Sequence, residues 1–282
     1  MSSPVSQVGD IERGEEERVL VTDLWRYPVK SMAGRREPVL GVEPWGPMGD
    51  RRWAVVDATG GLVTARTAAE LLHIRPGVSA GGLLLSWRHR RLGVAMPDHD
   101  MLIDVRISRV GRAVDAGEEA ARFLSSVLGQ PVRLVWQQDP EKRAISARNG
   151  GLAGESLSLA DAGPVLLTSQ ASLAALQEWV GSTPHLVQER FRPNVVIDGD
   201  VPFAEDTWTR VQLGAAGFRV QGPCDRCVMT TIDPATLDRG PQPLRALAEH
   251  RKWGGKVFFG VWLVPLDARP VRVGDAVRTT TR

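Results

Sequence analysis

The feature that most constrains the fold is a succession of short β-forming segments separated by clusters of glycine, proline and aspartate. Residues 37–42, 52–56 and 61–65 are such segments, and the turn clusters at residues 46–50 and 57–61 separate them at hairpin spacing. A doubly wound fold alternates strands with helices, and this chain shows no such regular alternation. We therefore expect an α+β fold that is mainly β, with barrel-like mixed or antiparallel sheets and about three packed helices.

Three segments carry helix signals. Residues 118–128 place apolar side chains at a period near 3.6 residues, and Gly129 and Pro131 follow as stop signals. A second helix is expected from Ser169, a capping residue, through Trp179. The third is expected at residues 244–250.

Composition limits the class of protein. A chain of 282 residues with 43% hydrophobic content can bury one large core or two modest ones. The net charge of +2 gives no basic field for a nucleic acid or an anionic membrane. No segment approaches the about 20 apolar residues of a membrane helix, and residues 1–18 are polar and lack a secretory core. We expect a mobile tail at 1–18, no nucleic-acid or membrane partner and a cytoplasmic location.

The two cysteines, Cys224 and Cys227, fix where thiol chemistry can occur. Arg226 lies beside Cys227 and is expected to favour its thiolate. A thioredoxin-like site would need a helix at the second cysteine, but a β-branched run and Pro234 follow it. A structural zinc site would need four ligands, and one Cys-x-x-Cys supplies two. A buried, inert cysteine is a further reading. The remaining interpretation is a single cysteine thiolate that binds a metal carried by a cofactor.

Polar residues at strand ends and in loops could bind such a cofactor. Together they suit a heterocycle that bears a phosphate, although single arginines at strand ends are usually solvated or paired. No dinucleotide fingerprint, phosphate loop, nucleophile elbow or zinc-protease motif competes with them. These residues are Lys30, Ser31, Thr64, Arg66, Ser169, Arg192 and Asn194.

Several motifs occur in order along the chain from residue 19 to its end. They are Tyr27-Pro-Val-Lys-Ser, Gly49-Asp-Arg-Arg-Trp, Thr64-Ala-Arg, Phe191-Arg-Pro-Asn, Cys224-Asp-Arg-Cys-Val-Met-Thr-Thr-Ile-Asp-Pro and Val273-Gly-Asp. In this combination the chain resembles the MOSC family with its N-terminal β-barrel domain. The branch that it resembles most is the mitochondrial amidoxime-reducing component and its bacterial relatives. The resemblance implies an N-terminal β-barrel-type domain at 19–130 and a MOSC domain at 131–282.

The resemblance also implies a molybdenum cofactor (Mo-molybdopterin) and an oxidoreductase that reduces N-oxygenated, N-hydroxylated compounds. Cys227 would be the catalytic residue and the molybdenum ligand, with Cys224 as an accessory. Arg226 and Thr230 are added because they lie near Cys227 in the sequence. The residues implied to hold the pterin and its phosphate are Lys30, Ser31, Thr64, Arg66, Thr168, Ser169, Arg192 and Asn194.

Two departures from the family pattern affect substrate and partner. The mitochondrial enzymes have a tyrosine after a Phe-Gly pair, and here Trp262 stands near that position. Some bacterial relatives carry an iron-sulfur domain, for which two cysteines do not suffice. We therefore expect a separate electron-donor protein of ferredoxin, flavoprotein or cytochrome type, and a small-molecule N-O substrate. The alternatives are a cofactor-binding or sulfur-carrier module without reductase activity and a biosynthetic enzyme for a dedicated N-O or S-O metabolite.

Overall fold

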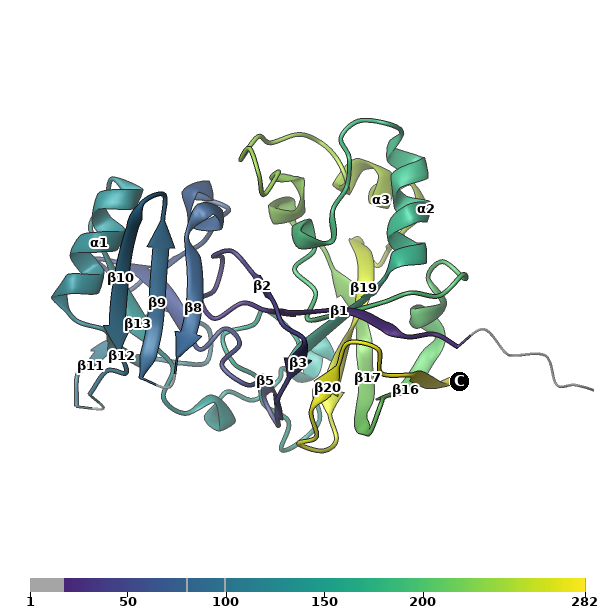
Figure 1. Cartoon of the computed structure of the whole chain (residues 1–282), viewed down its shortest axis with the longest axis horizontal. Helices are drawn as coiled ribbons and strands as arrows, with labels where there is room; N and C mark the ends of the chain where they lie inside the picture. Colours follow the sequence, from purple (N-terminus) through teal and green to yellow (C-terminus); the bar gives the residue numbers. More distant parts are fainter. Residues whose placement is uncertain (1–17, 80, 99, 282) are drawn as a thin grey trace, which may run out of the picture.

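The computed structural model describes residues 18–79, 81–98 and 100–281, so the mobile tail expected at 1–18 lies, except for Arg18, outside the described residues. Figure 1 shows two lobes side by side, with α1 (Glu118–Leu128) on one and both α2 (Gln170–Val180) and α3 (Leu244–His250) on the other. Within the described ranges these are the three α-helices. None of these helices has the length and apolar character that crossing a membrane requires.

The first lobe is built from two antiparallel sheets and α1. In the five-stranded sheet the order is β11 (Leu102–Asp104), β12 (Arg112–Asp115), β13 (Val132–Trp136), β6 (Trp53–Asp57) and β7 (Leu62–Val63). The three-stranded sheet consists of β10 (Arg90–Ala95), β9 (Gly82–Trp87) and β8 (Arg75–Ser79). One core joins both sheets to the helix through residues such as Val55, Leu85 and Leu124.

The second lobe contains a nine-stranded sheet in which β14 pairs with β15 in parallel and the other pairs are antiparallel. Backbone hydrogen bonds between residues 19–21 and residues 274–277 join the start of β1 (Val21–Arg26) to the start of β21 (Val277–Thr281). The strand order of this sheet is β2 (Arg35–Arg36), β1, β15 (Val195–Ile197), β14 (Val165–Ser169), β19 (Lys256–Pro265), β17 (Ala216–Asp225), β16 (Trp208–Leu213) and β21, with β18 (Lys252–Trp253) on β19.

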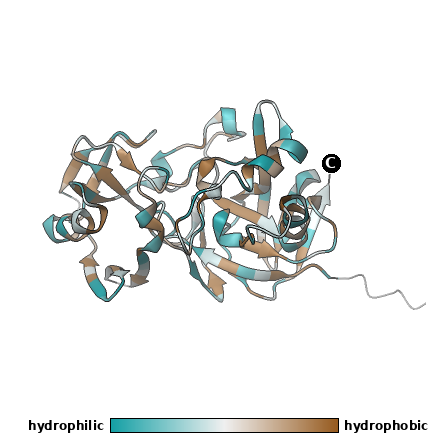
Figure 2. Ribbon diagram, turned by 90° about the horizontal axis from the view of Figure 1, so that it is seen from above, coloured by the Kyte–Doolittle hydropathy of each residue, from teal (hydrophilic) through white to brown (hydrophobic). Residues whose placement is uncertain are grey.

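Burial explains why β19 sits at the middle of this sheet. Its residues 258–264 are all buried, as expected for a strand covered on both faces. Figure 2 shows the apolar segments concentrated on the strands of both lobes. Leu176 of α2, Leu247 of α3 and Phe259 of β19 share one cluster, so these helices cover part of the sheet.

Two further sheets have two strands each. One pairs β3 (Val39–Leu40) with β20 (Val271–Arg272), and the other pairs β4 (Val42–Glu43) with β5 (Gly46–Pro47). The described residues also form short 3-10 helices, which are η1 (Ala69–His73), η2 (Pro140–Lys142), η3 (Ala147–Asn149), η4 (Gln188–Arg190), η5 (Ala204–Thr207) and η6 (Val228–Thr231).

The expected fold class is confirmed, because the chain is mainly β with mixed and antiparallel sheets and three helices. All three helices occur where the local signals predicted them. The domain boundary at residue 130 stays a prediction. The sheets do not follow this boundary, because strands from both sides of it pair with each other. β1 and β2 lie in the sheet of the second lobe, and β13 pairs with β6 of the first, because strand pairing joins segments that are distant in sequence.

Candidate functional site

A pocket gathers most of the residues that the sequence singled out. It lies where the loop after β1, the loop after β7 and the second lobe meet, and its lining contains six basic side chains but only two acidic ones. Because the whole chain has a net charge of only +2, this excess of positive charge is local. The predicted site residues in the lining are Lys30, Ser31, Thr64, Arg66, Arg192, Arg226, Cys227 and Thr230.

The cysteine turn, residues 224–231, forms one side of the pocket. Cys224 ends the buried part of β17, whereas Cys227 is exposed and starts the 3-10 helix η6. The β-branched run after Cys227 therefore forms a helical turn. The backbone oxygen of Cys227 accepts hydrogen bonds from Thr230 N (3.1 Å) and Thr230 Oγ1 (3.0 Å), so this threonine hydroxyl fixes the turn.

The expected partnership between Arg226 and Cys227 is corrected by the structure. Arg226 Nη1 donates to Cys224 Sγ at 2.8 Å, and its Nη2 donates to Phe191 O at 2.6 Å. Arg226 follows directly after β17, whose pairing with β19 is irregular at this end, and its side chain reaches back to Cys224. Burial raises the pKa of Cys224 to about 11, against the opposing charge of Arg226, so this sulfur is a thiol at neutral pH.

Lys30 and Asp161 form a second pair in the lining. Lys30 Nζ donates to Leu159 O at 2.8 Å and to the Asp161 carboxylate. Burial lowers the pKa of Lys30, while Asp161 opposes that shift. The charge of Lys30 in turn holds the pKa of Asp161 well below its usual range, so this carboxylate is ionised at neutral pH.

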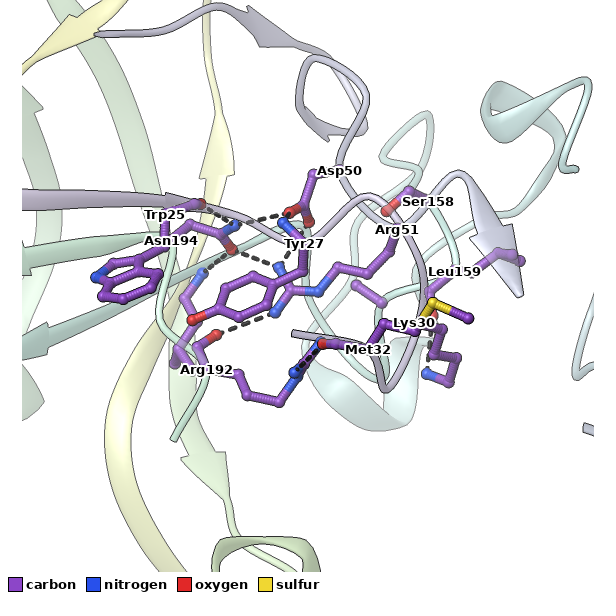
Figure 3. A network of polar contacts seen from close by, with 12 residues as sticks. Trp25, Tyr27, Lys30, Met32, Asp50, Arg51, Ser158, Leu159, Arg192 and Asn194 are labelled. Carbon is purple, nitrogen blue, oxygen red and sulfur yellow. Dashed lines mark hydrogen bonds and ion pairs between the residues drawn. The ribbon is translucent and has the colours of Figure 1, made fainter. Parts of the chain in front are cut away.

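The arginine wall consists of Tyr27, Asp50, Arg51, Arg192 and Asn194 (Figure 3). Arg51 and Arg192 line the pocket, and the other three residues contact these arginines from outside the lining. Arg51 Nη1 donates to Asp50 Oδ2 (2.6 Å) and Asn194 Oδ1 (2.9 Å), and its Nη2 donates to Arg192 O (3.0 Å). Asn194 Nδ2 donates to Trp25 O and to Asp50 Oδ1, both at 3.1 Å. This network joins β1, β15 and the turn after β5 below the pocket.

Three predicted residues lie outside the lining. Thr168 Oγ1 donates to Gln188 Oε1 at 2.9 Å, and Ser169 Oγ accepts from Ser172 N at 3.4 Å as the cap of α2. The side chain of Asn194 is fully buried in the arginine wall. The structure therefore shows what these side chains hold together in the protein, and their cofactor contacts stay predictions.

Sequence reasoning missed four charged residues of the lining, namely Arg51, Asp161, Arg190 and Asp225. Arg51 and Arg190 lie in or beside motifs that carried the resemblance, so a signal was available for both. Arg190 is almost fully buried, and its Nη2 atom pairs with Asp233 Oδ2 at 2.5 Å. Asp161 follows an ordinary apolar segment, and nothing local distinguishes it.

The lining leaves several buried donors without an acceptor among the described residues. They are Arg190 Nε, Arg192 Nη2, Arg226 Nε and Trp262 Nε1. A buried donor without an acceptor is costly, so this set fits a ligand rich in negatively charged or carbonyl oxygens. The described residues hold no group of three or more His, Cys, Asp or Glu that could bind a metal ion by themselves. A metal at Cys227 would therefore need further ligands from a cofactor.

Two family models match the chain, the MOSC N-terminal beta barrel domain over residues 18–131 and the MOSC domain over residues 154–278. A molybdenum cofactor sulfurase of Danio rerio is 34% identical over 270 residues, which cover 88% of this chain and 32% of that protein. The chain thus spans about a third of the length of that sulfurase.

Mitochondrial amidoxime-reducing component 1 of Mus musculus is 31% identical over 281 residues, covering 91% of this chain and 81% of that protein. Among solved structures, the YuaD protein of Bacillus subtilis matches with a TM-score of 0.44 and 12% identity, over 94% of this chain and 96% of that one. The identity to the mouse protein over nearly the whole chain, together with both domain matches, shows that this chain belongs to the MOSC domain family.

Proposed function

We propose that the chain is a molybdenum-cofactor-dependent oxidoreductase that reduces N-hydroxylated and other N-oxygenated compounds, with Cys227 as the protein ligand of molybdenum. The observation that carries the proposal is an exposed thiol at a pocket where several buried arginine N–H groups have no acceptor among the residues that the structure describes. The name of the mouse relative, an amidoxime-reducing component, supports the reaction class. The cysteine chemistry supports the ligand, because a thiolate binds soft metals.

The chain's residues divide the work between binding and redox chemistry. Lys30, Ser31, Arg66 and Arg192 hold the anionic part of the cofactor, with Thr64, Arg226 and Thr230 nearby in the lining. When bound, the molybdenum cofactor supplies a metal that changes its oxidation state by two electrons. Cys227 is the cysteine that a cofactor can reach, because Cys224 is buried and its sulfur accepts a hydrogen bond from Arg226.

The overall reaction consumes two electrons and two protons. In an N-hydroxylated substrate the N-O bond breaks, one proton bonds to the nitrogen, and the hydroxyl takes the other proton and leaves as water. The electrons come from a separate donor protein of ferredoxin, flavoprotein or cytochrome type. Phe191, Met229 and Trp262 line the same pocket and offer apolar surface to the organic part of the substrate. Both cysteines are free, which fits a proposed cytoplasmic location where thiols stay reduced.

A second candidate is a cofactor-binding or sulfur-carrier module without reductase activity. The match to the sulfurase of Danio rerio favours it, because that relative is as similar to this chain as the amidoxime-reducing component is. In that role Cys227 would accept sulfur from a partner, and no substrate would be reduced.

The test measures molybdenum and pterin per folded chain in wild type, Cys227→Ser and Cys224→Ser, all produced in a host that makes the cofactor. We expect near-stoichiometric molybdenum in the wild type, lost or spectroscopically altered coordination in Cys227→Ser, and retained metal in Cys224→Ser. Reduction of an aromatic amidoxime with reduced methyl viologen then separates the two candidates. Cofactor without any reduction favours the carrier module, and folded wild type with neither molybdenum nor pterin refutes both cofactor-based functions.

A further inference from the structure

Tyr27 is the aromatic residue of the arginine wall, and both arginines of the wall lie over its ring. Its ring is buried, and the guanidinium carbons of Arg51 and Arg192 lie 4.4 Å and 4.2 Å from the ring centroid (Figure 3). At these distances the negative face of an aromatic ring attracts a cation. The hydroxyl of Tyr27 has no hydrogen-bond partner among the described residues, so the ring, and not the phenol oxygen, makes the useful contacts.

The two arginines differ in how their charge is compensated. Arg51 forms an ion pair with Asp50 at 2.6 Å. No carboxylate in the described part of the chain lies within ion-pairing distance of Arg192, whose Nη1 donates to Met32 O at 2.6 Å and whose Nη2 has no acceptor. Burial lowers the pKa of Arg192 to about 10, so the group still carries its charge at neutral pH. Of the two arginines of the wall, Arg192 is therefore the one whose charge is available to bind an anion.

Backbone geometry indicates that the surrounding structure enforces the conformation of the residues around the two arginines. Ser31, Arg51 and Arg192 have φ angles of +67°, +45° and +58°, which non-glycine residues rarely adopt, and all three line the pocket. Such conformations persist only where the surrounding structure enforces them. Gly34 packs against the ring so closely that a Cβ there would overlap it, which fixes the position of Tyr27.

We propose that Tyr27 is a positioning residue, whose ring holds the uncompensated guanidinium of Arg192 charged and oriented for a phosphate-type anion in the pocket. The proposal rests on the proposed function only in taking the anion to belong to the cofactor. Arg192 makes the contact with the ligand, and Tyr27 acts through it. Replacement of the ring changes anion binding even though no atom of Tyr27 touches the ligand.

The experiment titrates the full-length chain, produced in a host that does not make the molybdenum cofactor, with inorganic phosphate by calorimetry, after circular dichroism has shown that each variant is folded. Tyr27→Phe keeps the ring face and removes only the unpartnered hydroxyl, so its affinity stays within about twofold of wild type. Tyr27→Leu lowers the affinity about tenfold, which is the size of a well-buried cation–π contact. In an Arg192→Met background, Tyr27→Leu has no additional effect, because the partner of the ring is gone.

A series of fluorinated phenylalanines at position 27 provides a second measurement that preserves shape and folding. Each added fluorine weakens the negative ring face, so phosphate affinity falls stepwise, by about fivefold over mono-, di- and trifluorinated rings. A purely structural role of the side chain predicts equal affinity along this series. Equal affinities, or equal effects of Tyr27→Leu with and without Arg192, overturn the proposal, and so does wild type that binds no phosphate.

The molybdenum and pterin content of wild type produced in a host that makes the cofactor separates this inference from the proposed function. Ring-dependent phosphate binding by the cofactor-free chain, with neither molybdenum nor pterin in the protein from the second host, keeps the positioning role of Tyr27 and refutes the cofactor. Cofactor in the protein from the second host, with a phosphate affinity of the cofactor-free chain that ignores the fluorine series, refutes the role of Tyr27 alone.

Discussion

The arginine wall and the cysteine turn face the same pocket, but they are stabilised over very different distances in the sequence. In the wall, Arg51 binds Asn194, which lies 143 residues away, and Asn194 binds Trp25, which lies 169 residues away. In the turn, Thr230 and Thr231 donate to backbone oxygens three residues earlier. The wall is thus a buried network that tertiary packing assembles, whereas the turn is a local structure with an exposed thiol.

This difference shows how a binding side and a reactive side can coexist in one pocket. The charges of the wall are buried and positioned before a ligand arrives, which reduces the cost of ordering on binding. The thiol of the turn is exposed, and hydrogen bonds between near neighbours shape the 3-10 helix that follows it, although Arg226 also links the turn to Phe191 O. Three further predictions test this contrast.

Removal of a carboxylate should affect the two sides very differently. In Asp50→Asn the buried charge of Arg51 loses its partner, so we expect a loss of about 3 kcal/mol in the free energy of unfolding. The matched control is Asp225→Asn, in the turn, where the partner Lys256 is exposed and the expected loss is below about 0.5 kcal/mol. Urea denaturation measures both, and equal losses would remove the distinction between buried wall and open turn.

The two cysteines should differ strongly in alkylation. At pH 8 we expect iodoacetamide to modify Cys227 at least about 100 times faster than Cys224, because Cys224 is buried and thiolates are the reactive form. With a pKa of about 11, about one Cys224 in a thousand is a thiolate at pH 8, and this fraction rises tenfold at pH 9. The Cys224 rate should therefore increase with pH. Peptide mass spectrometry follows each site, and the urea-unfolded chain, in which both cysteines react alike, is the control.

The smallest expected effect concerns the strained loop beside the wall. Ser31 has a φ of +67°, which glycine adopts without strain, whereas the φ of Cys227 is an ordinary −120°. We expect Ser31→Gly to be about 0.5 kcal/mol more stable than Ser31→Ala, because relief of strain exceeds the added freedom of the unfolded chain. Thermal unfolding compares the pair. A higher stability of Ser31→Ala would show that the backbone at Ser31 is not strained.

The sequence located the local elements well. The helix expected at residues 118–128 has those same bounds, because its apolar period and the following glycine lie within one short segment. The cysteine turn was also found from its residues, although its 3-10 helix and the bond from Arg226 to Cys224 were not. The roles assigned to the site residues and the domain boundary stay predictions.

By itself the sequence determined the mainly β fold class, the three helices and the position of the two thiols, since turn signals, helix period and residue identity act over a few neighbours. Tertiary structure alone decided that Lys30 pairs with Asp161. It also decided that Arg51 has an ion-pair partner in Asp50, whereas Arg192 has none among the described residues. The places of Thr168, Ser169 and Asn194 outside the lining were decided in the same way. The physical reason is that strand pairing such as Leu24 with Val195, and the burial that makes an unpaired charge costly, depend on segments far apart in the chain.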